Sequence, residues 1–262
     1  MTKPNGDETT AEQPIDPLEL DQASDSSRPR RPLNSIMQSL SARLPCDDDR
    51  VRLDGEAEKC RRQRIVTEMI SHAGKEFRNY TLNRYRDKTS DQRKAKSAVV
   101  EWWQSFPERL ERREGMVLYG PVGTGKDHLA FGAVAAAVME FGCSAAYRNG
   151  RDLMAEMRDR IGGSRHESSL IDGLAIPDVL IVSDPLPVRG ELSDFQADFL
   201  YRLIDARSAS GLVTVCTLNV ADDEEADRRL GAATWDRLCD KAWKIACFWQ
   251  SYRQPVRKVG GS

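Results

Sequence analysis

A glycine-rich run near the middle of the chain constrains the fold more than any other feature. Residues 120–126 read Gly-Pro-Val-Gly-Thr-Gly-Lys and fit G-x-x-x-x-G-K, a loop whose backbone N–H groups surround phosphates while its lysine reaches the outer ones. The apolar run 116–119 predicts a short buried strand before the loop, and 127–141 predicts an apolar helix after it, whose N-terminus favours anions. The chain is therefore expected to contain a nucleotide site built on an α/β fold.

The residue that follows Lys126 departs from this pattern. A serine or threonine hydroxyl for Mg²⁺ is expected there, and the chain has Asp127. A carboxylate can bind Mg²⁺ directly because oxygen ligands suit that ion, but it also places a negative charge near the phosphates. At an effective dielectric constant of about 20, a like charge about 5 Å away costs about 3 kcal/mol per unit charge, or roughly a hundredfold in affinity, unless Mg²⁺ or Lys126 offsets it. This substitution predicts nucleotide binding with inefficient hydrolysis.

Composition divides the 262 residues into a tail, a basic region and an α/β part. Residues 1–50 are acidic at first and rich in Pro and Ser, which predicts disorder, although 33–44 has the pattern of a short helix that either docks on a partner or forms transiently. Residues 51–112 have a helical pattern and are basic. Their basic side chains either contact nucleic acid or form a solvated helical face. Residues 113–255 are long enough for one α/β domain, and 256–262 form a C-terminal tail.

The α/β part alternates strands and helices, as a parallel sheet flanked by helices requires. The predicted strands are 116–119, 144–148, 179–183, 212–218 and 244–249. The predicted helices are 127–141, 150–160, 192–208, 221–230 and 235–241. Phe195 is expected on the apolar face of its helix. Before the sheet, Trp102 and Trp103 lie on an apolar stripe, which places them in the core rather than against stacked bases.

Cysteine usage and hydropathy exclude several classes of protein. The six cysteines form no C-x-x-C pair and have no histidine at ligand spacing, so no zinc site is predicted. Cys143, Cys216 and Cys247 fall in predicted strands as small hydrophobic residues, and this usage suits a reducing cytosol. No run approaches 18 apolar residues, and the N-terminus lacks a basic start followed by an apolar stretch. We therefore expect a cytoplasmic protein without a membrane span or signal peptide.

A phosphate loop also needs an acid at the end of a neighbouring strand to hold the metal. Asp184 directly follows the strand 179–183, and the place of a usual second acid, which orients water, is held by Pro185. Proline side chains can neither accept a proton nor orient water. In an alternative register Ser183 is the metal ligand and Asp184 is the second acid. The first register is preferred because Leu186 then lies where an apolar residue follows the pair. In either register one acid is missing.

Five segments, in order, resemble the DnaC/IstB-like branch of the AAA+ ATPases, which includes bacterial and phage helicase loaders and transposition regulators. The resemblance covers about residues 77–253 and rests on short motifs. These are 120–129 (GPxGTGKTHLA, with Asp127 in place of Thr), 184–187 (Asp-Asp-Leu-Gly, with the second Asp and the Gly lost), 199–207 (a helix ending L-I-x-x-R), 214–219 (T-x-x-T-x-N), and 235–238 with 248–253 (D-R-[LM] … W-x-S-Y-R).

The resemblance implies ATP and Mg²⁺ as cofactors and suggests a role for each matching residue. Asn219 would sense the γ-phosphate. Arg237 would reach the nucleotide of a neighbouring subunit in a homo-oligomer, or instead pair with an acid on its own helix. Lys126 would clamp the outer phosphates, while Asp184 and Asp127 would hold Mg²⁺. The nucleotide-binding residues would be Gly120, Pro121, Val122, Gly123, Thr124, Gly125, Lys126, Asp127 and His128.

The resemblance, together with the departures at Asp127 and Pro185, leaves three hypotheses for the function. The leading hypothesis is an ATP-binding helicase loader or primosomal accessory factor in DNA replication, which contacts a replicative helicase and single-stranded DNA through its basic region. The second is a nucleotide-gated interaction module with little or no hydrolysis, favoured by Asp127 and Pro185. The third is an IstB-like transposition helper whose partner is a transposase. A small-molecule kinase is disfavoured because no segment forms a recognisable lid or acceptor pocket.

Overall fold

The computed structural model describes residues 47–161 and 167–253. The chain divides into two compact units, Met1–Val51 and Arg52–Ser262, and the described part of the first unit is only the start of helix α2. The short helix predicted over 33–44, together with most of the predicted N-terminal tail and the whole C-terminal tail, lies outside the described residues.

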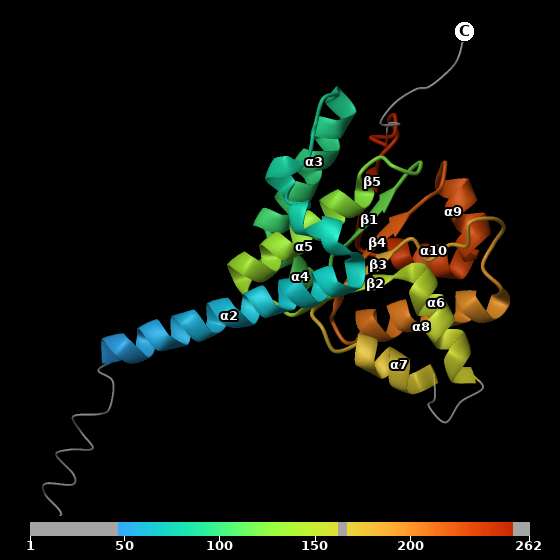
Figure 1. The fold of residues 1–262 in the computed structure, drawn as a ribbon. Coiled ribbons are helices and arrows are strands. Elements are labelled where there is room, and N and C mark those ends of the chain that lie inside the picture. The colour runs from blue at the N-terminus through green and yellow to red at the C-terminus, as the bar shows by residue number, and fades with distance from the viewer. Residues whose placement is uncertain (1–46, 162–166, 254–262) are drawn as a thin grey trace, which may run out of the picture. The chain divides into compact units, whose positions relative to one another are not determined.

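Five parallel strands form one sheet in the order β2-β3-β4-β1-β5 (Figure 1). The strands are β1 (Gly115–Tyr119), β2 (Ala145–Asn149), β3 (Val179–Ser183), β4 (Val213–Leu218) and β5 (Ala242–Ala246). Because parallel strands end at the same edge of a sheet, the residues after β1, β3 and β4 meet there, and ligands of open α/β sheets bind at that edge. The predicted α/β fold with a parallel sheet is confirmed.

Helices precede the sheet and connect its strands (Figure 1). The elements before β1 are α2 (Asp47–Ala73), the 3₁₀ turns η1 (Lys75–Asn79) and η2 (Leu82–Arg84), α3 (Ser90–Gln104) and α4 (Phe106–Arg112). The connecting helices are α5 (Lys126–Phe141), α6 (Gly150–Ile161), α7 (Glu167–Leu174), α8 (Asp194–Ala209), α9 (Asp223–Leu230) and α10 (Ala232–Cys239). Each strand and helix predicted after residue 113 is present, with ends shifted by at most three residues.

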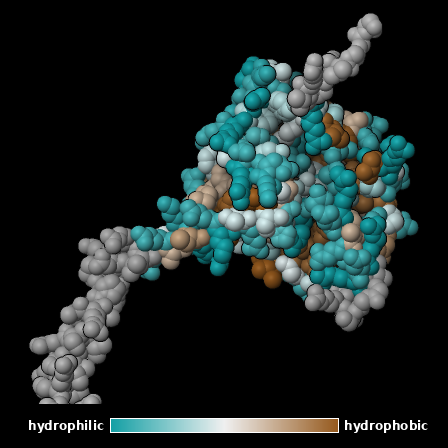
Figure 2. All heavy atoms as spheres, in the orientation of Figure 1, coloured by the Kyte–Doolittle hydropathy of each residue, from teal (hydrophilic) through white to brown (hydrophobic). Residues whose placement is uncertain are grey.

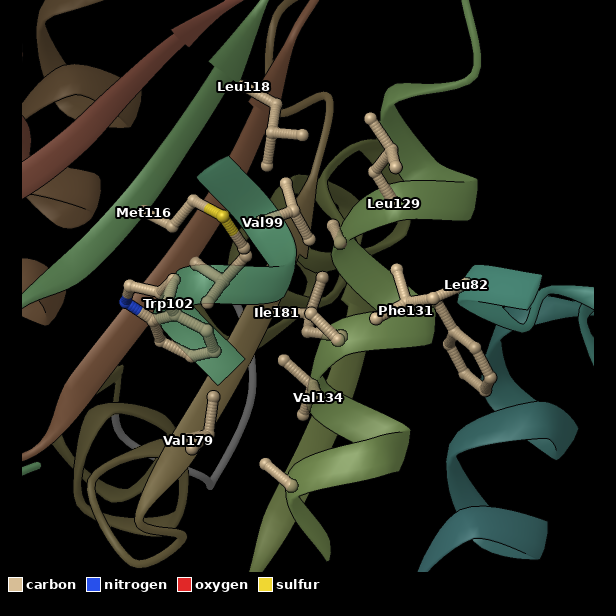
Figure 3. Close-up of a cluster of buried hydrophobic side chains, with 14 of the residues drawn as sticks. Leu82, Val99, Trp102, Met116, Leu118, Leu129, Phe131, Val134, Val179 and Ile181 are labelled. Atoms are coloured by element: carbon tan, nitrogen blue, oxygen red, sulfur yellow. The ribbon is translucent and has the colours of Figure 1, made fainter. Parts of the chain in front are cut away.

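Side chains alternate between the two faces of the sheet, as the period of a strand requires. In β3, Val179 and Ile181 join a buried cluster with α3 and α5, whereas Leu180 and Val182 join a second cluster with α6 to α10. Figure 3 shows the first cluster, in which side chains of α3 and α5 meet those of the sheet. All four of these β3 side chains are buried, which explains the continuous apolar run of this central strand.

The segment before the sheet is part of the same core. Phe77, Leu82 and Tyr85 pack in the first cluster, and Trp102 is fully buried, with its Nε1 donating to the carbonyl of Glu114 at 3.0 Å. The expected core position of Trp102 is thus confirmed. The helical pattern of 51–112 corresponds to α2, α3 and α4, although between α2 and α3 the chain turns through η1 and η2 and then runs extended before Thr89 caps α3.

Smaller corrections concern the ends of strands and helices. Cys143 precedes β2 and Cys247 follows β5, although both are buried, and only Cys216 lies within a strand. Phe195, expected on the apolar face of its helix, is 41% exposed in the first turn of α8, whereas Phe199 one turn later is fully buried. Helix α7 was not predicted. Figure 2 shows a mostly hydrophilic visible face with small separate hydrophobic areas. None of the helices in the described ranges is long and apolar enough to span a membrane.

Candidate nucleotide-binding site

The glycine-rich loop connects β1 to α5 at the carboxyl edge of the sheet. Gly120, Gly123 and Gly125 have positive φ angles of 146°, 81° and 87°, which L side chains rarely adopt. The loop is also crowded: a Cβ at Gly120 would lie 2.5 Å from the carbonyl oxygen of Cys247, and one at Gly125 would lie 2.9 Å from the ring of Tyr85. Glycine is therefore required both for conformation and for space. The first turn of α5 then presents N–H groups that have no partner within the helix.

Lys126, the first residue of α5, lies beneath the loop and is only 4% exposed. Its ammonium donates to the carbonyl oxygens of Gly120 and Pro121, each at 2.7 Å. Burial lowers the pKa of Lys126, because the charged form is taken out of water. In this conformation the loop's own carbonyls hold the charge of Lys126.

Asp127 points from α5 toward the ends of β3 and β4. Its Oδ1 accepts hydrogen bonds from Ser183 Oγ at 2.8 Å and from Thr217 Oγ1 at 2.7 Å. Ser183 and Thr217 are register partners in the two strands, and their side chains therefore lie on the same face of the sheet, the one that α5 covers. Sequence reasoning missed Thr217, because its place beside Asp127 depends on the pairing of β3 with β4.

Asp184 follows β3 and is held by Asn219, which follows β4. Asn219 Nδ2 donates to Asp184 Oδ2 at 2.6 Å, and the Asn219 backbone N–H donates to Oδ1 at 3.4 Å. Asp184 has φ 49°, an uncommon left-handed conformation that Asp tolerates better than most residues. Burial raises the pKa of Asp184, opposed by the Asn219 hydrogen bonds and by Arg151, whose guanidinium lies 3.9 Å away. These two predicted site residues are thus in direct contact.

Two neighbouring cavities open beside the loop. The first, of about 420 Å³, is lined by Lys126, Asp127 and His128 together with aromatic and basic residues from η1–η2 and the C-terminal segment. These additional lining residues include Tyr80, Arg84, Tyr85, Arg86, Tyr252 and Arg253. The second, of about 510 Å³, contains Asp127, Ser183, Asp184 and Asn219. Asp127 and Asn219 line both, so the two cavities adjoin along the residues predicted to meet the outer phosphates.

His128 contacts the segment before the sheet. Its Nε2 lies 2.8 Å from the carbonyl oxygen of Thr81, and its ring stacks on Tyr80 with centroids 4.6 Å apart. A carbonyl only accepts hydrogen bonds, so Nε2 carries the proton, and burial lowers the pKa of the imidazole. His128 therefore fixes the wall of the first cavity rather than presenting a cation to phosphates.

The C-terminal segment fastens the other side of the loop. The backbone N–H of Tyr252 donates to the carbonyl of Gly123 at 2.8 Å, and Trp249 Nε1 donates to the carbonyl of Thr124 at 2.8 Å. Tyr85 OH also reaches that Thr124 carbonyl, at 3.4 Å. Elements from both ends of the described chain thus hold the loop in place, which no local sequence pattern indicates.

Arg237 lies apart from these residues. It is on α10 and pairs with Asp205 of α8 at 2.8 Å and with Asp240 at 3.1 Å, and it lines neither cavity beside the loop. The structure therefore brings Lys126, Asp127, Asp184 and Asn219 together but leaves Arg237 outside this group.

A parallel sheet with β4 between β1 and β3, a glycine-rich loop leading into α5, and an acid after β3 define a P-loop nucleotide-binding protein of the AAA+ class. The chain belongs to the family of IstB-like ATP binding proteins, whose family model matches residues 49–259. It is similar in fold to several solved structures, while no curated protein matches its sequence.

Three of these structures each cover about two thirds of this chain and more than nine tenths of their own chains. The DnaC helicase loader is 21% identical, with a TM-score of 0.58 over 66% of this chain and 99% of that one. A putative primosome component from Streptococcus pyogenes is 20% identical, with a TM-score of 0.56 over 69% and 92%. DnaI is 19% identical, with a TM-score of 0.55 over 69% and 94%. At these identities the likeness shows a shared fold.

Proposed function

We propose that this protein binds ATP with Mg²⁺ and acts as a helicase loader or primosomal accessory factor in DNA replication. One observation carries the nucleotide part: Lys126 and Asp127 at the start of α5, Asp184 after β3 and Asn219 after β4 meet beside a glycine loop at the edge where α/β sheets bind ligands. Backbone N–H groups and Lys126 would bind the phosphates, and Asn219 would contact the outermost one.

The donor atoms at this edge fit a magnesium ion. Asp127 and Asp184 offer carboxylate oxygens, and Ser183 and Thr217 offer hydroxyls, all of which are ligands that suit Mg²⁺. No group of three or more His, Cys, Asp or Glu that could hold a metal occurs within the described ranges. Magnesium commonly combines one or two carboxylates with substrate phosphates and water, so the nucleotide would complete the site. Bound Mg²⁺ would neutralise charge on the phosphates.

The basic segment before the sheet is proposed as the region that contacts a helicase or single-stranded DNA. Its helix α2 is joined to the far end of α5: Arg61 donates to the carbonyl of Gly142 at 2.5 Å, and Arg62 to those of Met139 and Glu140 at 2.9 Å. A partner on α2 and phosphates at the loop would thus act on opposite ends of one helix. The named functions of the similar structures, helicase loading and a primosome role, support this assignment.

Three further parts of the proposal rest on the sequence. The domain boundaries are proposed as 1–50, 51–112, 113–255 and 256–262. Arg237 is proposed to reach a neighbouring subunit in a homo-oligomer, which requires it to leave Asp205 and Asp240. A cytoplasmic location is supported by Cys60, Cys143, Cys216, Cys239 and Cys247, all of which are free thiols.

A second candidate is a nucleotide-gated module with little hydrolysis. The observation that favours it is the proline at position 185, whose backbone packs so closely on the start of α6 that a Cβ at Gly150 would lie 2.2 Å from it. The proline side chain has no polar atom, so no polar side chain directly follows Asp184. A transposition role with a transposase partner shares the same site, and the family name accommodates it.

The test is ATP turnover by the full-length protein with and without single-stranded DNA, beside Lys126→Ala. Arg158→Ala is the control, because Arg158 is an exposed cation on α6, outside both the basic segment and the cavities beside the loop. Turnover that DNA stimulates, and that only Lys126→Ala abolishes, supports the helicase-loader proposal. ATP binding without turnover supports the gated module instead. A folded protein that does neither contradicts both.

A further inference from the structure

The contact between Asp127 and Ser183 reverses the usual arrangement at a P-loop. In P-loop NTPases Mg²⁺ is held by a Ser or Thr hydroxyl that follows the loop lysine and by an acid on a neighbouring strand. Here the carboxylate follows the lysine, as Asp127, and the hydroxyl ends the strand, as Ser183. Their Oδ1 and Oγ atoms are 2.8 Å apart, so the same two chemical groups meet with their positions interchanged.

The alternation of side chains along β3 shows which residue at the end of this strand faces α5. Ser183 lies two residues after Ile181, whose side chain packs in the cluster beneath α5, and alternate residues of a strand share a face. Ser183 is also opposite Thr217 in β4. Asp184 turns out of the strand at φ 49° and binds Asn219 instead. The strand position that meets α5 is therefore Ser183.

We infer that Asp127 and Ser183 have exchanged the two metal-site roles, with Asp127 supplying the carboxylate for Mg²⁺ and Ser183 orienting that carboxylate, which leaves Asp184 as the second acid beside Asn219. This inference rests on the proposed ATP site. With these roles no acid is missing, because Asp127 is the carboxylate at the metal and Asp184 is the second acid.

The exchange changes the expected effect of Asp127 on nucleotide affinity. A hydroxyl–carboxylate pair carries one negative charge whichever residue provides it. Because the two groups are in hydrogen-bond contact, moving the carboxylate from the strand to the helix shifts that charge without adding another. The repulsion between Asp127 and the phosphates was calculated on the assumption that Asp127 is an additional charge. In the exchanged pair, Asp127 instead replaces the carboxylate that β3 would otherwise carry.

The test is a double-mutant cycle on the full-length protein: Asp127→Thr, Ser183→Asp and both together. Binding of a non-hydrolysable ATP analogue is measured in Mg²⁺ and in EDTA, and unfolding by urea is measured without nucleotide. Asp127→Thr leaves two hydroxyls and Ser183→Asp opposes two carboxylates, so each single change disrupts the pair, while the double variant restores it in reverse. Asp127→Asn and Ser183→Ala serve as conservative variants in case Ser183→Asp does not fold.

We expect Mg²⁺ to strengthen binding to the wild type, and Asp127→Thr and Asp127→Asn to reduce that enhancement at least about tenfold. Ser183→Ala removes a residue that orients the metal ligand. It should reduce the Mg²⁺ enhancement by no more than about 100-fold, because loss of such a residue typically costs about 10-fold to 100-fold. The double variant should recover the enhancement and should be more resistant to urea than Ser183→Asp. Wild-type enhancement that survives in Asp127→Asn, or a double variant no better than the singles, overturns the exchange. A wild type that binds no nucleotide in either buffer refutes the proposed ATP site itself.

Discussion

Asp184→Asn distinguishes the two roles that an acid at this position can have. The Asp184 carboxylate is 17% exposed and accepts from Asn219 at 2.6 Å and 3.4 Å. An asparagine has the same shape, keeps an oxygen that accepts from Asn219, and tolerates the left-handed backbone at φ 49°. The substitution therefore removes the charge and the basicity with little change in packing.

If Asp184 is the second acid, it orients water by accepting a hydrogen bond, and its loss should slow turnover about 10²-fold to 10⁴-fold, as for other general bases. Affinity for ATP with Mg²⁺ should not fall, since Asp127 remains and a negative charge near the phosphates is removed. Asp184→Asn should also stabilise the folded protein at pH 7. Burial raises the pKa of Asp184 above 3.8, so the stability carried by the protonated form is present below that value and is lost as pH rises through the folded pKa.

The assays are turnover, ATP binding in Mg²⁺ and in EDTA, and thermal unfolding without nucleotide at pH 7. Asp91→Asn is the control, because Asp91 is 70% exposed on α3. Normal affinity with lost turnover and a raised Tm agrees with the second-acid role. A loss of affinity confined to Mg²⁺ would show that Asp184 is itself a metal ligand and would refute the reasoning.

Three further predictions concern stability. Gly120→Ala should lower the free energy of unfolding in urea by at least about 2 kcal/mol, because φ 146° is strained for alanine and its Cβ would meet the carbonyl oxygen of Cys247. Gly190→Ala, in open space at φ 78°, should lower it by about 1 kcal/mol. Equal losses would contradict the crowding at Gly120. Arg207→Met should lower the free energy of unfolding by about 3 kcal/mol, because three carbonyls and a hydroxyl lose the fully buried guanidinium that donates to them. Arg202→Met, exposed on the same helix, should lower it by less than about 1 kcal/mol. The reverse order would contradict this. Two arginines hold the pKa of Glu58 at about 2 instead of 4.5, so its stabilising effect is present above pH 4.5 and lost as pH falls toward 2; Glu58→Gln should flatten that part of the acid-unfolding curve, and an unchanged curve would contradict it.

The sequence predicted the elements whose pattern is local. The run Val179–Val182 is apolar because both faces of β3 are covered, and the observed strand, which ends at Ser183, has the predicted bounds. The glycine loop was predictable because a fixed spacing of glycines and one lysine is needed to surround phosphates. Helix α7 was not predicted, since eight residues containing two serines and a glycine provide a weak helical pattern.

The missing parts of the site depend on contacts between distant segments. Tyr85 and Tyr252 fasten the loop from opposite ends of the described chain, and nothing near either residue in sequence points to that contact. The partnership of Asp127 with Ser183 and Thr217 requires the register of β3 against β4. Sequence reasoning named both registers for Asp184 but had no geometric basis for choosing between them.

The most direct test of nucleotide binding is calorimetric titration of ATP into the full-length wild-type protein, in Mg²⁺ and in EDTA, with Lys126→Ala beside it. We expect binding that Mg²⁺ strengthens and that Lys126→Ala weakens by at least about a hundredfold, since a charge about 4 Å from phosphate contributes about 4 kcal/mol at an effective dielectric constant of 20. A folded wild type that releases no heat and binds no ATP under either condition would contradict it.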